Sequence, residues 1–122
     1  MNALRNKVQL IGNLGMNPIV TELDGGRKVA KFTLATNETY KNQKGERVQD
    51  TQWHNVVAWG KTAELMEQLL AKGKEVMVEG KLTNRSWDDK DGNKRYITEV
   101  IANEFLLMTP KEGTAKGGDL PF

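Results

Sequence analysis

Residues 50–61 contain the most chemically suggestive pattern in the chain. Trp, Val and Thr favour a pleated surface, so this stretch predicts a β-strand. Side chains alternate along a strand, which places Trp53, Asn55, Val57 and Trp59 on one face. Exposed indoles can stack on the bases of a nucleic acid. Two interpretations stay open for this strand alone: an exposed stacking platform, or core packing of both rings, because Trp is highly buried on average.

Two further aromatic residues have polar or cationic neighbours. A predicted strand over residues 74–87 places Trp87 on the same face as Lys81 and Arg85. Tyr40 stands at the base of a polar segment, residues 38–49, which reads as a long hairpin loop. Other cations near the rings in the sequence are Lys61, Lys72 and Lys74. Core packing explains one ring easily and four poorly, so the set favours a nucleic-acid surface with phosphate contacts from Lys and Arg.

Other kinds of site find little support. His54 is the single histidine, and no acidic residue or second histidine stands at ligand spacing around it. The acidic segment 88–92 fails as a calcium loop because its first and last ligand positions would be Trp87 and Thr98. Cysteines are absent, which excludes disulfides and thiolate metal sites. We therefore expect no enzymatic activity, no metal and no cofactor.

Composition predicts a single globular domain with a separate tail. The 122 residues carry a formal net charge of +2, and no apolar run reaches the length of a membrane span. The first residues lack an apolar secretion signal, so we expect a cytoplasmic protein with no membrane partner. Residues 1–109 are the expected folded domain. Residues 110–122 are an expected disordered, flexible linker ending in a short tip.

The order of elements predicts an all-β fold. Strands are expected over residues 7–15, 19–23, 27–37, 50–61, 74–87 and 95–102, the last of which continues over 103–108 or is followed there by a final strand, with a helix over 61–72 between the third and fourth long strands. This order is that of the OB-fold, a five-stranded Greek-key barrel. In this interpretation the helix closes the barrel and carries no exposed chemistry.

Several motifs, in order along the chain, resemble those of bacterial single-stranded DNA-binding proteins (SSBs). They are residues 6–15, 51–57, 59–64, Lys72-Gly73, 78–82, Trp87 and the final Asp119-Leu120-Pro121-Phe122. The resemblance implies an OB-fold homotetramer that binds and protects single-stranded DNA in replication, recombination and repair, in association with the nucleoid. It implies base stacking at Tyr40, Trp53, Trp59 and Trp87, beside a binding surface that includes Asn55, and it places His54 near a subunit interface. It also implies docking of replication and repair proteins on Asp119, Leu120, Pro121 and Phe122.

The chain departs from the family pattern in its tail. The linker is short, and Asp119 is the single acid among the last six residues, which predicts weaker docking than an acidic tip would give. Three rivals stay open: a primosome-type OB protein, an RNA-binding OB module, and a scaffold that binds only proteins. The Leu120-Pro121-Phe122 tip argues against the first. The relative affinity for DNA and RNA tests the second, and failure to bind oligonucleotide at low salt would favour the third.

Overall fold

The structure is a computed structural model, and it describes residues 4–108 of the chain. Six strands and one α-helix follow one another, with a short 3₁₀ turn at Asp24–Gly26. Their bounds are β1 (Val8–Leu14), β2 (Ile19–Glu22), β3 (Lys28–Lys41), β4 (Arg47–Trp59), α1 (Gly60–Leu69), β5 (Glu75–Asp88) and β6 (Lys94–Leu107). No helix among the described residues is long and apolar enough to cross a membrane.

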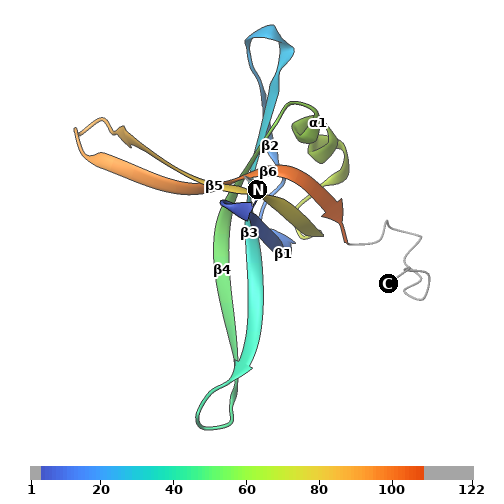
Figure 1. Ribbon diagram of the computed structural model, residues 1–122, viewed down its shortest axis with the longest axis vertical. Helices are drawn as coiled ribbons and strands as arrows, with labels where there is room; N and C mark the ends of the chain where they lie inside the picture. Colours follow the sequence, from blue (N-terminus) through green and yellow to red (C-terminus); the bar gives the residue numbers. More distant parts are fainter. Residues whose placement is uncertain (1–3, 109–122) are drawn as a thin grey trace.

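Five of the strands close into a barrel. The order along the sheet is β1-β5-β6-β4-β3, and β1 returns to pair with β3 at Asn13 and Leu14. The β4–β6 pairing is parallel and the others are antiparallel, while β2 extends the sheet beyond β3. A five-stranded Greek-key barrel with its helix between the third and fourth barrel strands is the OB-fold, so the fold predicted from the sequence is confirmed (Figure 1).

The barrel interior is filled by small and medium apolar side chains from every barrel strand and from α1. The residues almost fully shielded from solvent are Leu14, Ala30, Phe32, Leu34, Val56, Ala58, Ala63, Met66, Val76, Val78, Val100 and Ala102. Ala63 and Met66 come from α1, which therefore closes one end of the barrel as predicted. Since no tryptophan belongs to this core, the three indoles are free for another role.

The helix is shorter than the sequence predicted. It ends at Leu69 rather than Lys72, because Leu70 adopts an extended conformation and buries its side chain in the core. Gly73 therefore does not terminate the helix. Its positive φ of 89° instead shapes the turn that leads into β5.

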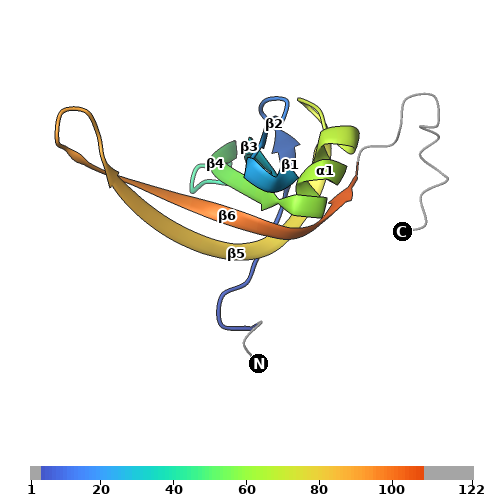
Figure 2. The ribbon, with the colours of Figure 1, turned by 90° about the horizontal axis from the view of Figure 1, so that it is seen from above.

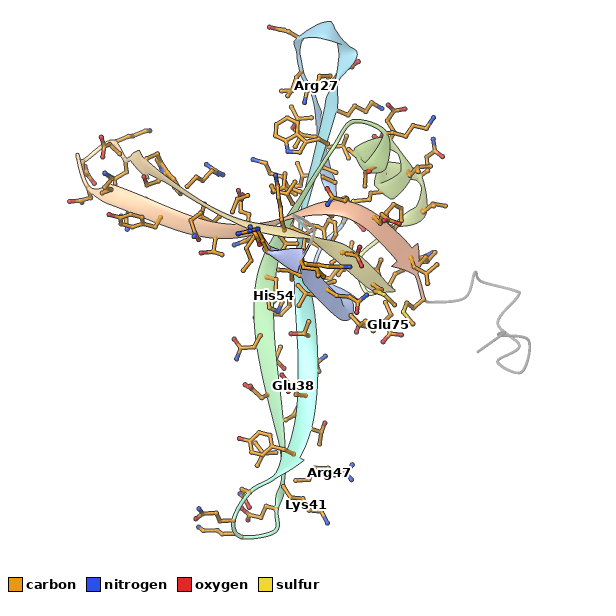
Figure 3. All side chains as sticks on the ribbon, in the orientation of Figure 1. Arg27, Glu38, Lys41, Arg47, His54 and Glu75 are labelled. Carbon is orange, nitrogen blue, oxygen red and sulfur yellow. The ribbon has the colours of Figure 1, made fainter. Side chains whose placement is uncertain are left out.

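The predicted loop over residues 38–49 is largely a regular hairpin. β3 and β4 continue as a paired ribbon as far as Lys41 and Arg47, which leaves only a short turn between them. The prediction was wrong because these strands lack apolar alternation: both faces of the ribbon meet solvent. Lys41 and Arg47 lie at its tip, and His54 lies near its base (Figure 3).

Strands β5 and β6 form a second, curved arm (Figure 2). The arm ends in a tight turn in which the Asp89 carboxylate accepts hydrogen bonds from the N–H groups of Asp91 and Asn93 and from Arg95. Where the arm joins the barrel, a β-bulge at Glu79 and Gly80 interrupts the register. Gly80 is required there, because a Cβ atom would collide with the carbonyl of Ile101.

Candidate nucleic-acid interface

The strand register brings the predicted site residues of β4 and β5 onto one surface. Val57 and Trp59 on β4 lie opposite Lys31 and Val29 on β3. Strand β6 joins β4 to β5, because Glu99 pairs with Asn55 on one side and with Thr83 on the other. We call this surface the aromatic face, and it comprises Lys31, Thr33, Trp53, Asn55, Val57, Trp59, Lys81, Thr83, Arg85, Trp87, Glu99 and Ile101.

All three indoles of the aromatic face are accessible. Their exposed fractions are 61% for Trp53, 40% for Trp59 and 43% for Trp87. Asn55 is exposed between the first two rings, while Val57 is buried beneath them. The choice left open by the sequence therefore falls on an exposed platform rather than on core packing.

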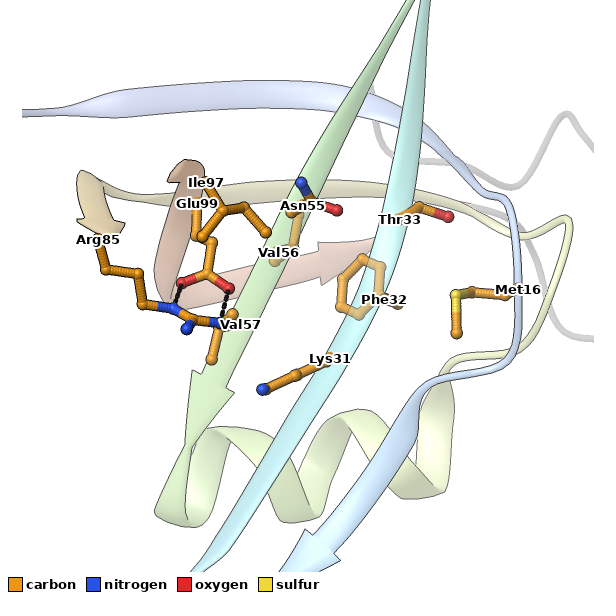
Figure 4. Close-up of a pocket in the computed structure, with 10 residues that line it drawn as sticks. All are labelled: Met16, Lys31, Phe32, Thr33, Asn55, Val56, Val57, Arg85, Ile97 and Glu99. Carbon is orange, nitrogen blue, oxygen red and sulfur yellow. Dashed lines mark hydrogen bonds and ion pairs between the residues drawn. The ribbon is translucent and has the colours of Figure 1, made fainter. Parts of the chain in front are cut away.

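A groove runs across the centre of this face. It has a volume of about 670 Å³ and is lined by apolar side chains of β2, β3, β4 and β6, with Trp59 on its wall. A smaller pocket of about 240 Å³ adjoins it (Figure 4). Lys31, Val57, Arg85 and Glu99 line both. An apolar floor with a few charged groups suits a flat ring whose edge carries polar atoms.

One wall of the groove carries a fixed ion pair. Nε of Arg85 donates to Oε1 of Glu99 at 3.0 Å, and Nη2 donates to Oε2 at 3.3 Å. These hydrogen bonds raise the pKa of the Arg85 guanidinium above its ordinary value. The same guanidinium lies 5.3 Å from the centre of the Trp87 ring, within the range of a cation–π contact.

A second cation–π pair, absent from the sequence prediction, lies at the other end of the groove. The guanidinium of Arg27 stands 5.4 Å from the centre of the Trp59 ring. Arg27 lies at the β2–β3 hairpin (Figure 3). Lys31 lies four residues further along the chain, in β3. The alternation of β3 could have placed Lys31 on this face, but only the register with β4 shows that it faces Val57.

The Trp53 ring lies over the turn that follows β1. A Cβ atom at Gly15 would come within 2.5 Å of this ring, so glycine leaves room for it. The same turn is hydrogen-bonded to the segment before β5, through Leu14 N–H to the Lys74 carbonyl and Lys72 N–H to Oδ1 of Asn17. The predicted cations Lys72 and Lys74 therefore lie at the Trp53 end of the aromatic face.

Besides Lys72 and Lys74, two more predicted site residues lie outside the aromatic face. Lys61 is exposed in the first turn of α1, just after Trp59. Tyr40 is 54% exposed, but it pairs with Val48 near the tip of the ribbon, and the alternation puts it on the opposite side from Trp53. The structure thus joins the three tryptophans and leaves Tyr40 apart, where a ligand would have to follow the twist of the ribbon to reach it.

Tyr96 is an exposed ring that the sequence prediction did not include. It pairs with Ser86 in the β5–β6 arm, while its neighbour Arg95 pairs with Trp87. Opposite residues share a face, so Tyr96 and Trp87 point to different sides of the same arm. Tyr96 is therefore outside the aromatic face.

His54 has a local role in the ribbon. Its Nε2 lies 2.9 Å from Oγ1 of Thr36 on the neighbouring strand, in a half-buried position. Its neighbours Val56 and Ala58 belong to the barrel core. Val56 and Ala58 are therefore not available for contact with another subunit, and the placement of His54 near a subunit interface stays a prediction.

Within residues 4–108, no group of three or more His, Asp or Glu side chains lies close enough to hold a metal ion. The charged groups of the aromatic face are mainly cations, and its one buried acid is already paired with Arg85. The face is thus equipped for stacking and for attraction of anions.

This combination of a closed OB barrel and an open aromatic face defines an OB-fold binding protein. The model of the single-strand binding protein family matches residues 5–108, and the chain belongs to that family. Two relatives are named "Single-stranded DNA-binding protein 1". The protein of Chlorobaculum tepidum is 42% identical over 96% of this chain and 73% of its own length. The protein of Xylella fastidiosa is 41% identical over 93% of this chain and 85% of its own length.

A solved structure shows the same fold. It is described as a Plasmodium falciparum SSB complex with ssDNA, and it aligns with a TM-score of 0.75 at 38% sequence identity. The alignment covers 84% of this chain and 91% of the other. The shared fold therefore extends over most of both chains.

Proposed function

We propose that this protein binds single-stranded DNA, with little regard to sequence, on the aromatic face. The observation that carries the proposal is the placement of three exposed tryptophans on one continuous surface of a barrel whose core is complete without them. Stacking suits any base, because every base has a π-face. Family membership and the DNA-bound structural neighbour support the same conclusion.

Each group has a part in this proposal. Trp53, Trp59 and Trp87 stack on bases, and Asn55 offers an amide between the first two. Lys31, Lys61, Lys72, Lys74 and Lys81 attract the phosphates. Trp53 and Trp59 stand six residues apart on β4, or about 20 Å, so a bound strand must extend across the groove between them. Tyr40 would contact DNA only where the strand continues along the ribbon.

A fluorescence titration tests this function. Adding a dT oligonucleotide to the full chain at low salt should quench the tryptophan emission, because bases stack on the indoles. An RNA oligonucleotide of equal length and uracil sequence measures the preference for DNA. Unchanged emission and no retention of labelled oligonucleotide would contradict the proposal and favour a protein-binding scaffold.

Assembly into a homotetramer is the second part of the proposal. Among the described residues, no strand pairs with the β1 edge that faces away from β5 between Val8 and Ile11. Ile11 lies beside Met77, which lies beside Leu106, and Ile11 and Leu106 are exposed. A free edge next to an apolar stripe favours self-association. Light scattering at micromolar concentration should give the mass of four chains, and Ile11→Asp should lower it; a monomeric wild type would contradict this part.

The biological role forms the last part of the proposal. DNA binding and family membership support protection of single strands in replication, recombination and repair, and a cytoplasmic, nucleoid-associated location. Asp119, Leu120, Pro121 and Phe122 lie outside the described residues, and their docking of partner enzymes rests on the sequence. Deleting residues 120–122 should leave DNA affinity unchanged and weaken the capture of replication or repair enzymes; equal capture by both chains would contradict it.

A further inference from the structure

Arg85 was expected to contact phosphate, yet the structure gives its guanidinium two partners within the protein. One is the Glu99 carboxylate, which it binds through two parallel hydrogen bonds (Figure 4). The other is the ring of Trp87. Arg85 thus connects a residue in the groove to an indole on the arm.

Glu99 is the one charged residue buried within residues 4–108, with a side chain only 7% exposed. Arg85 is its only ion-pair partner in that part of the chain. A buried carboxylate that loses its partner is strongly destabilising. Arg85 therefore cannot leave Glu99 for a phosphate without a penalty, and its planar fork matches the carboxylate in a fixed orientation.

The pair is also electrically neutral. Salt dependence of DNA binding counts the cations that neutralise phosphates, at about 0.7 per phosphate on a single strand. A guanidinium already neutralised by a carboxylate adds little to that count. Lys81 is the useful contrast: it lies four residues earlier on the same strand and face, is exposed, and has no ion pair among the described residues.

We propose that Arg85 and Glu99 are positioning residues, which hold the Trp87 indole at a fixed orientation for stacking, and that Arg85 is not a phosphate ligand. The proposal rests on the proposed function, because stacking at Trp87 is the event that it serves. Glu99 anchors the guanidinium, and the guanidinium supports the ring. Pre-orientation of the ring lowers the entropy lost when a base binds.

A double-mutant cycle on DNA affinity separates the two roles. Arg85→Ala/Glu99→Gln removes both charges together and leaves no unpaired carboxylate, which protects the fold. It should weaken binding to dT less than Trp87→Ala does, and should have no further effect in the Trp87→Ala background. Lys81→Ala is the matched control, and its effect should persist in that background. An undiminished loss from the Arg85→Ala/Glu99→Gln change in the Trp87→Ala background would overturn the proposal.

The salt dependence gives a second test. Lys81→Ala should reduce the slope of log affinity against log salt by about 0.7, whereas Arg85→Ala/Glu99→Gln should leave the slope at its wild-type value. A reduction of about 0.7 in the paired variant would identify Arg85 as a phosphate ligand.

A measurement without DNA separates this inference from the proposed function. Trp53→Phe/Trp59→Phe leaves Trp87 as the single tryptophan. In that background, Arg85→Ala/Glu99→Gln should increase acrylamide quenching and the fast rotation of the indole, while Lys81→Ala should change neither. Unchanged quenching in the paired variant would overturn the positioning role even in a protein that binds DNA. If the wild type fails to bind dT, the proposed function fails, and this measurement still decides whether the pair orders the ring.

Discussion

Each end of the central groove has an arginine over a tryptophan ring, but the surroundings of the two arginines differ. At one end Arg27 lies over Trp59, and at the other Arg85 lies over Trp87, with nearly equal distances of 5.4 and 5.3 Å. Arg85 is bound to the buried Glu99, whereas no carboxylate of residues 4–108 lies within ion-pair distance of Arg27. The two ends therefore match in their ring contact and differ in their anchoring.

The difference shows that a cation beside an aromatic ring does not by itself indicate a phosphate contact. A guanidinium with no acid can move toward a phosphate when DNA arrives, and it then contributes to counterion release. A guanidinium held by a carboxylate keeps its orientation and supports the ring. The Trp59 end is thus expected to adapt to the ligand, while the Trp87 end is already ordered.

The largest expected effect is loss of the rings themselves. Trp59→Ala and Trp87→Ala should each weaken DNA binding by about 1–3 kcal/mol, because each removes a stacking platform. Titration with dT, followed by anisotropy of a labelled oligonucleotide, measures the loss. Tyr96→Ala is the matched control, since Tyr96 is exposed on the other side of the same arm, and its binding should stay close to wild type. Wild-type affinity in both tryptophan variants would refute the stacking role.

A replacement that keeps the charge should separate the two ends. Lysine retains the positive charge but lacks the planar fork that binds a carboxylate through two hydrogen bonds. Arg27→Lys should therefore bind DNA nearly as well as the wild type, whereas Arg85→Lys should lose affinity and free the Trp87 ring. Parallel titrations at one salt concentration measure this difference. Equal behaviour of the two variants would mean that the Glu99 anchor has no consequence for binding.

Removing the cation at the adaptable end should change the salt dependence by a small, defined amount. Arg27→Ala should lower the slope of log affinity against log salt by about 0.7, because one phosphate contact is lost. Titrations at four or more salt concentrations give the slope. An unchanged slope would place Arg27, like Arg85, among the residues that support a ring without touching phosphate.

The smallest expected effect is a destabilisation of the β5–β6 turn, beyond Trp87, at low pH. Hydrogen bonds from the Asn93 N–H and from Arg95 hold the pKa of Asp89 below its ordinary value of 3.8. Because the folded pKa is the lower one, the carboxylate stabilises the turn fully above pH 3.8 and loses this effect as the pH falls through the folded pKa. The amide NMR signals of Asp91 and Asn93 should shift in that window. Asp89→Asn should abolish the step, and a step that persists would assign it to another group.

Alternation along single strands was enough to predict much of the site. It placed Trp53, Asn55 and Trp59 together on β4, and Lys81, Arg85 and Trp87 together on β5. It did not show that the two sets share one surface, since that depends on how Glu99 of β6 lies between Asn55 and Thr83. The helix and the closed barrel were predicted from the order of elements.

The alternation of side chains along one strand could not predict contacts between residues of different strands. Arg85 and Glu99 are diagonal neighbours across β5 and β6, because Arg85 pairs with Ile97 and Glu99 with Thr83. Arg27 meets Trp59 only through the pairing of β3 with β4. The ribbon was mistaken for a loop because a strand exposed on both faces has no apolar period, and Tyr40 was consequently placed at a base rather than near a tip.

The β-bulge at Glu79 and Gly80 determines which side chains of β6 face the barrel core. Glu79 pairs with Glu104 and Gly80 with Ala102, so Asn103 is one residue more than the ladder needs. Because the bulge absorbs this residue, Phe105 and Leu107 on one side of it and Val100 and Ala102 on the other all pack on the barrel core, although odd and even positions are mixed. Deleting Asn103 would turn Glu79–Glu104 and Gly80–Ala102 into successive pairs of a regular ladder, and Glu99 would stay opposite Thr83 on the side of Arg85. β6 should therefore tolerate the loss of Asn103 better than the loss of one residue between Glu99 and Ala102, where the ladder has no extra residue to absorb the change.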